Sequence, residues 1–185
     1  SSSAVGANGD AGNITINTKA LSLTGGAVIS SSTFDAGNAG SIIINASETL
    51  SIKGSGQNGL TFLDEPSAIR TAGILLPEAF LKSFGLPLKV TGNAGTIEIN
   101  TDHLQIEDGG LVTVRHDSLG NAGNLEINAD SAILNQQGKI TASTISGEGG
   151  NINLNFKNSL ILRNNSLIDT ESFSRSEERR VGKEC

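Results

Sequence analysis

The chain has 185 residues, a formal net charge of −6, and six phenylalanines as its only aromatic residues. An acidic chain without a basic patch argues against nucleic acid as a partner. No apolar run approaches the ~20 residues that a membrane-spanning helix needs. Its apolar fraction of 36% permits a core, but a narrow aliphatic one.

A nine-residue motif recurs five times and organises the chain. The copies are GDAGNITIN at residue 9, GNAGSIIIN at 37, GNAGTIEIN at 92, GNAGNLEIN at 120 and GEGGNINLN at 147. Three of the four intervals between these starts are close to one period, and the interval from the second copy to the third is close to two. Because a fixed period in the twenties is typical of a solenoid, we interpret residues 1–174 as one repeat region.

Each period predicts three short strands. In the first, residues 13–17 and 20–24 alternate polar and apolar side chains, and a third short strand begins at Ala27 after the turn signal Gly25-Gly26. The later periods keep this layout. Three strands in a period of about 28 residues favour an all-β fold, a right-handed single-stranded parallel β-helix. In such a fold each strand pairs with its equivalent one coil away, at about 4.8 Å.

Two positions of the motif have expected structural roles. We expect the glycine at its fourth position to allow a positive φ or a close backbone approach at a corner, at Gly12, Gly40, Gly95, Gly123 and Gly150. An asparagine ends the first strand of every coil, at Asn17, Asn45, Asn100, Asn128 and Asn155. These amides either form a ladder along the stack or act as ordinary turn residues.

Residues 55–91 form an excursion from the repeat. Within it, residues 67–71 can serve as the third strand of the second coil. A proline at the start and a glycine after the end predict a short helix from Pro77 to Phe84. Its apolar face is a candidate partner surface, or else it packs on the flank of the repeats; the residues concerned are Leu76, Phe80, Leu81 and Phe84.

Residues 175–185, RSEERRVGKEC, differ from everything before them. They resemble the conceptual translation of a common sequencing adapter, and we exclude them from the fold prediction. The only cysteine lies there, so the repeats predict no disulfide or thiolate metal site. The chain opens within a repeat and without a signal peptide, which suggests an internal piece of a longer protein.

The repeats resemble those of filamentous-haemagglutinin-like exoproteins, the secreted partners of two-partner secretion systems. GNAGxIxIN followed by LxI and GGxV carries the resemblance over residues 9 to about 173, most closely to the cyanobacterial branch. The resemblance implies an adhesin or stalk at the outer surface of a Gram-negative bacterium. It also implies an outer-membrane transporter as a partner, engaged through a domain not recognised here. Glycans or proteins of host cells, neighbouring cells or surfaces are the further partners that it suggests.

The rival hypothesis is a β-helical polysaccharide lyase or hydrolase, which needs clustered carboxylates or a basic residue in a groove. Its candidates are Glu107, Asp108, Arg115, His116 and Asp117, with Asp64, Glu65 and Arg70. None has a motif spacing, so we predict a solvated face, no catalytic residues and no enzyme activity. We also expect no cofactor and no metal. Only Asp10 among the second motif residues suits calcium, and the pair His103 and His116 is a weak zinc signal.

Overall fold

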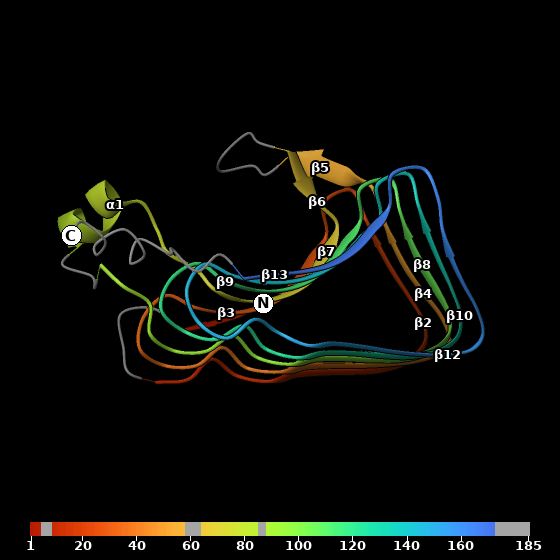
Figure 1. The fold of residues 1–185 in the computed structure, drawn as a ribbon, viewed down its shortest axis with the longest axis horizontal. Coiled ribbons are helices and arrows are strands. Elements are labelled where there is room, and N and C mark those ends of the chain that lie inside the picture. The colour runs from red at the N-terminus through yellow and green to blue at the C-terminus, as the bar shows by residue number, and fades with distance from the viewer. Residues whose placement is uncertain (5–8, 58–63, 85–87, 173–185) are drawn as a thin grey trace, which may run out of the picture.

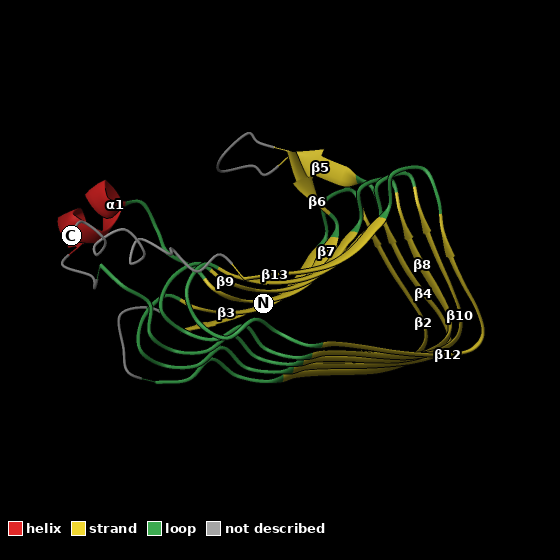
Figure 2. Ribbon diagram, in the orientation of Figure 1, coloured by secondary structure: helices red, strands yellow, loops and turns green. Residues whose placement is uncertain are grey.

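The computed structural model describes residues 1–4, 9–57, 64–84 and 88–172, so the predicted adapter segment lies outside the described residues. This part of the chain is mostly β-strand with one short helix (Figure 2). The all-β prediction is confirmed at that level. The elements are β1 Ser2–Ala4, β2 Ile14–Thr24, β3 Val28–Thr33, β4 Ile42–Lys53, β5 Ser55–Gln57, β6 Asp64–Pro66, β7 Ala68–Gly73, α1 Glu78–Phe84, β8 Ile97–Glu107, β9 Leu111–His116, β10 Leu125–Asn135, β11 Lys139–Thr144, β12 Ile152–Leu162 and β13 Leu167–Ser172.

The strands form two parallel sheets and one small antiparallel hairpin. The long strands make a five-stranded sheet in the order β12-β10-β8-β4-β2, and the short strands make a six-stranded sheet in the order β1-β3-β7-β9-β11-β13. Strands β5 and β6 pair only with each other among the described residues. Outside that hairpin the chain alternates between the two parallel sheets, which lie over one another in Figure 1.

The pairing register follows the sequence period. Ile97 pairs with Leu125 and Leu125 pairs with Ile152, so equivalent motif residues are direct neighbours. Ile42 pairs with Ile97, its equivalent in the next copy of the motif, so the long interval is one period with an insertion. This register keeps inward-facing positions next to inward-facing positions. A slip of one residue would turn every side chain of the strand to the opposite face of the sheet.

The structure has two strands in each period where the sequence predicted three. The first two predicted strands are joined into one long strand, as in β4 and β8. The joint has no glycine or proline pair to end the ladder. Instead the register shifts there, between Thr18 and Ala20 and again between Ala129 and Ser131. Such irregularities bend a strand without ending its pairing, and the long strands bend at this point (Figure 1).

A tight turn joins each long strand to the short strand that follows, except β4, which leads into the β5–β6 hairpin. Both central residues of this turn have positive φ, as at Asp108 and Gly109 and again at Gln136 and Gln137. The turn after β8 closes with a hydrogen bond of 2.9 Å from the Gly110 amide to the Glu107 carbonyl. Two consecutive left-handed residues favour glycine and asparagine. Gly25-Gly26 and Asn164-Asn165 fit that rule at the equivalent places.

The core lies between the two sheets and is aliphatic. Alternate residues of the long strands point inward, and the fully buried side chains include Ile42, Ile44, Ile97, Ile99, Leu125 and Ile127. Their counterparts in the first and last long strands are only partly buried. Full burial of one such side chain contributes about 1.5–3 kcal/mol. Each repeat therefore depends on its neighbours to complete its share of the core.

The extra residues of the excursion enter at two separate points. Val28 of β3 pairs with Ala68 of β7, and the β5–β6 hairpin lies between these two strands in the chain. Ala68 pairs in turn with Leu111 of β9, and the segment with α1 lies between β7 and the next long strand. Helix α1 begins at Glu78, directly after the predicted start at Pro77. Neither insertion disturbs the parallel pairing of β7 with its neighbours.

Candidate functional site

The motif asparagines form a continuous amide ladder on the outside of the long strands. The side-chain amide of Asn45 donates to the Asn17 carbonyl oxygen at 2.8 Å, and Asn100 donates to Asn45 at 2.9 Å. Asn128 and Asn155 continue the ladder at 3.0 and 2.9 Å. The structure therefore brings all five asparagines together in a line along the stack.

A second ladder runs through the glycine corner, and the sequence analysis did not identify it. The side-chain oxygens of the first four second-position motif residues each accept from the backbone amide one repeat on: Asp10 from Asn38, Asn38 from Asn93, Asn93 from Asn121 and Asn121 from Glu148. These bonds are 2.7–2.9 Å long. The repeated Asx residue at a fixed motif position was the signal for it.

The corner glycines lie where neighbouring repeats come closest. A Cβ at Gly40, Gly95, Gly123 or Gly150 would collide with the carbonyl oxygen of the motif glycine in the preceding repeat. Gly12 differs, because a Cβ there would meet only the Ser2 hydroxyl, at 3.2 Å. None of these five glycines has a positive φ. Close backbone approach is therefore the reason for glycine at this corner.

His116 lies in the core, so the prediction of a solvated face is wrong for this residue. Its side chain is fully buried, and its Nε2 donates to the Gly92 carbonyl at 2.6 Å while its Nδ1 accepts from the Ser118 amide at 3.1 Å. A Cβ at Gly73 or Gly120 would collide with the ring. Burial lowers the pKa of His116 below its usual value, although its hydrogen bond to the Gly92 carbonyl acts the other way.

The hydroxyl groups on the inner side of the short strands make similar contacts. Thr71 donates to the Gly95 carbonyl at 2.7 Å, Thr144 to the Gly120 carbonyl at 3.3 Å, and Ser31 to the Gly12 carbonyl at 3.2 Å. These bonds join the six-stranded sheet to the motif loops. His116 belongs to this inner polar row, so the catalytic and zinc hypotheses for it are not supported by its position.

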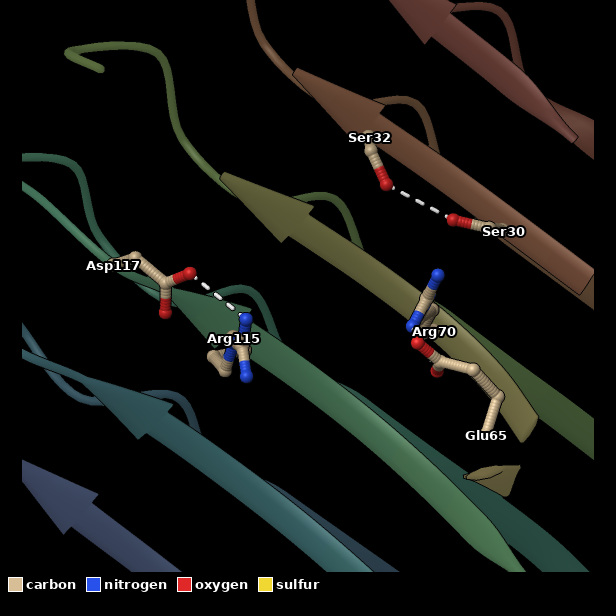
Figure 3. Close-up of polar contacts among 6 residues, drawn as sticks. All are labelled: Ser30, Ser32, Glu65, Arg70, Arg115 and Asp117. Atoms are coloured by element: carbon tan, nitrogen blue, oxygen red, sulfur yellow. Dashed lines mark hydrogen bonds and ion pairs between the residues drawn. The ribbon is translucent and has the colours of Figure 1, made fainter. Parts of the chain in front are cut away.

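Figure 3 shows four of the other candidate residues, Glu65, Arg70, Arg115 and Asp117; the two arginines lie on the outer face of the six-stranded sheet. Arg70 on β7 has its Nη1 3.7 Å from the Glu65 carboxylate of the hairpin. Arg115 on β9 donates to Asp117 at 2.8 Å. The Ser30 and Ser32 hydroxyls lie on the neighbouring strand β3, 2.9 Å apart. Both arginines thus share one polar face with a row of hydroxyl groups.

Glu107 and Asp108 lie away from that face, at the turn after β8. The Glu107 carboxylate pairs with the Lys53 Nζ at 2.6 Å, and this hydrogen bond lowers the pKa of Glu107. Asp108 is one of the two left-handed turn residues. The structure therefore divides the eight enzyme candidates among the core, the turn, the outer face and the hairpin, where Asp64 lies exposed on β6. It does not gather them into one cluster.

The residues of the predicted apolar helix face differ in their exposure to solvent. Leu81 is buried at 2% exposure, whereas Phe80 is 46% exposed and Leu76 is intermediate. The side chain of Phe84 is outside the described part of the structure. Leu81 is not a member of the aliphatic cluster between the sheets, so both expectations for this face, packing on the repeats and a partner surface, stay predictions.

The described surface includes two hollows of note. The larger, about 760 Å³, follows the asparagine ladder and includes Asp102, Asp130 and Lys157. Its charges are partly neutralised, since the Lys157 Nζ lies 2.6 Å from Asp130 and this contact raises the pKa of Lys157. The smaller, about 380 Å³, lies between the hairpin and the outer face. We call it the hairpin groove; its lining includes Ser30, Ser32, Gln57, Glu65, Arg70 and Ile74.

The described residues contain no group of three or more histidine, cysteine, aspartate or glutamate side chains placed to hold a metal ion. None of the helices in this part of the chain is both long and apolar enough to cross a membrane. Comparison of the chain with known protein families, curated proteins and solved structures found no match. The resemblance to exoprotein repeats therefore stays a prediction from the motif.

Proposed function

We propose that this chain is a right-handed parallel β-helix from the repeat region of a secreted surface adhesin or stalk of the filamentous-haemagglutinin-like type. The observation that carries the proposal is the register, which pairs each strand with its equivalent one period away in both sheets. The right-handed sense is supported by the rule that about 98% of parallel crossover connections have that hand.

The proposed mechanism is geometric. Ladders of backbone and amide hydrogen bonds fix the distance between coils, and the outward side chains and the two insertions are displayed at set positions along a stiff rod. Such a rod needs no catalytic residue. Its partners are an outer-membrane transporter during secretion, then glycans or proteins of a host cell, a neighbouring cell or a surface. It acts outside the cell or at the outer membrane of a Gram-negative bacterium.

The stalk proposal is tested by lengthening the array. A second copy of residues 92–146 is inserted after residue 146, which adds two periods. We expect the molecule to lengthen by about 10 Å with an unchanged cross-section, because each coil adds about 4.8 Å. Small-angle X-ray scattering measures both quantities. A rise in the cross-section without added length would contradict the proposal.

The rival enzyme hypothesis has a direct assay. Purified chain is incubated with a panel of acidic and neutral polysaccharides, and new reducing ends and unsaturated uronates are measured. We expect no cleavage, together with retention of the chain on at least one immobilised glycan or cell surface. Cleavage that is lost in an Arg70→Gln or Arg115→Gln variant would favour the polysaccharide-active enzyme instead.

A further inference from the structure

We propose that the hairpin groove binds the carboxylate of an acidic sugar, such as a uronate, with Arg70 as its anchor. This inference deepens the proposed function and rests on it, since it names a ligand class for which one coil of the array would display a site. The groove lies where the first insertion crosses the outer face of β3 and β7. Its volume of about 380 Å³ is at the small end of the usual range for ligand sites.

Arg70 is incompletely satisfied within the described structure. Its Nη1 makes only a long ion pair, 3.7 Å from Glu65, and its Nε is buried without a hydrogen-bond partner among the described residues. A guanidinium can bind a carboxylate through two parallel N–H···O hydrogen bonds, and in the side-on arrangement Nε is one of the two donors. A buried donor without a partner is costly. Because Nε has almost no exposed surface, the Arg70 side chain must turn toward the groove before a carboxylate oxygen can accept from it. That contact would be a strong, charge-assisted hydrogen bond.

The rest of the groove favours a sugar over other carboxylates. The Ser30 and Ser32 hydroxyls lie on the strand next to Arg70, and Gln57 reaches the groove from the hairpin. The two serines bond to each other at 2.9 Å, which leaves each oxygen with further acceptor capacity. Hydroxyl and amide groups that both donate and accept match the ring hydroxyls of a sugar. Ile74 supplies an apolar wall for the C–H face of the ring.

The Glu65 carboxylate competes with a ligand carboxylate for the Arg70 guanidinium. It stands beside the Arg70 guanidinium and is 34% exposed, so a bound carboxylate must share or displace that pair. Loss of the Glu65 charge should therefore strengthen anion binding. A groove that recognised a neutral sugar or a cation would not respond in this way.

The experiment is a titration of the full chain with trigalacturonate, followed by isothermal calorimetry and by NMR. We expect saturable binding that weakens with salt. Arg70→Gln should bind at least tenfold more weakly, because charge-assisted hydrogen bonds are lost. Glu65→Gln should bind about two- to fivefold more tightly, the range for an exposed ion pair. Arg115→Gln is the matched control, since Arg115 lies on the same face outside the groove and pairs with Asp117; its affinity should be unchanged.

Two further probes distinguish the ligand class. Maltotriose tests for a neutral sugar and triglutamate tests for a peptide carboxylate; we expect neither to match trigalacturonate. Equal binding of either one would overturn the proposal, as would equal loss in Arg70→Gln and Arg115→Gln. Arg70→Lys keeps the charge and the apolar stem but lacks the two parallel donors, and should lose affinity while the chain keeps its circular dichroism spectrum. Absence of trigalacturonate binding at millimolar concentration would reject this site, whereas the scattering test of the array would be unaffected.

Discussion

At the scale of single residues, the outer asparagine ladder gives each repeat a specific link to its neighbours. Asn100 donates to Asn45, accepts from Asn128 and also bonds to the Glu98 carboxylate at 2.9 Å. A typical net hydrogen bond contributes about 0.5–1.5 kcal/mol. The ladder therefore stabilises the stack without adding to the core.

Replacement of Asn100 by alanine should lower the free energy of unfolding by about 1.5–4.5 kcal/mol, since it removes two ladder bonds and the bond to Glu98. Urea denaturation measures the change. Gln105→Ala is the control, because Gln105 is also partly buried on the outer side of β8 and takes no part in the ladder. Equal losses for the two variants would show that the ladder bonds contribute nothing of their own.

His116 should make the stability of the chain depend on pH. Its pKa is lowered in the folded state, so the unfolded chain binds the extra proton more readily. The stabilisation is complete above the unfolded value of about 6.5. It is lost as the pH falls from there toward the folded pKa, at no more than about 1.4 kcal/mol per pH unit.

The variant for this prediction is His116→Thr, because threonine occupies the equivalent position at Thr33 and Thr144. We expect a lower midpoint in urea at pH 7.5 but a shallower pH dependence between pH 6.5 and 5 than in the original chain. A slope in that window that is unchanged by the substitution would mean that other groups cause it.

At the scale of elements, the two insertions show how far the sequence can be interpreted. The long and short strands, the ladder asparagines and the tight turns repeat, so each is supported by five or nearly five copies. The β5–β6 hairpin has no copy elsewhere in the described structure, and only tertiary contact decides where it lies. The hairpin groove and the pairing of Arg70 with Glu65 were therefore beyond a prediction from the sequence.

Two predictions were wrong although the neighbouring sequence already indicated the correct structure: the solvated position of His116 and the division of the long strand into two. His116 follows Val112 and Val114 at the inward spacing of a strand, and that alternation already pointed it into the core. The sequence also indicated that the long strand is continuous, because residues 101–104 contain no glycine or proline to end the strand pairing. The close approach at Gly40 was one of two expected reasons for glycine, and only the geometry distinguishes it from a positive φ.

Helix α1 should depend on Leu81 for its position. Leu81 is buried, and large-to-small substitutions in packed sites cost about 2–5 kcal/mol. We expect Leu81→Ala to release the segment between β7 and β8, seen as faster proteolysis there, with little change in the far-UV circular dichroism of the sheets. Lys82→Ala, on the exposed side of the same helix, is the control. Global unfolding in the Leu81 variant would show that the helix is part of the main core.

At the scale of the whole molecule, stability should be graded along the stack. Inward residues such as Ile42 and Ile97 are fully buried, whereas Ile14 and Ile152 in the first and last long strands are only partly buried. In repeat arrays each unit is stabilised mainly by its neighbours. The central repeats therefore have the most complete packing on both sides.

Amide hydrogen exchange should report that gradient. We expect the slowest exchange in β4, β8 and β10 and faster exchange in β2 and β12, because local opening follows packing and protection. Duplication of residues 92–146 supplies the control, since β10 should then gain protection as it moves further from the end of the stack. Uniform exchange in all five long strands would indicate that the array unfolds as one cooperative unit.

The two insertions have a practical consequence. Strand β7 keeps its partners on both sides, although the β5–β6 hairpin precedes it in the chain and the segment with α1 follows it. A foreign peptide spliced at either junction would thus add only the entropy of a longer loop, which grows slowly with length. Antigenic epitopes or affinity tags grafted at these junctions would be presented from a scaffold whose folding does not depend on their sequence.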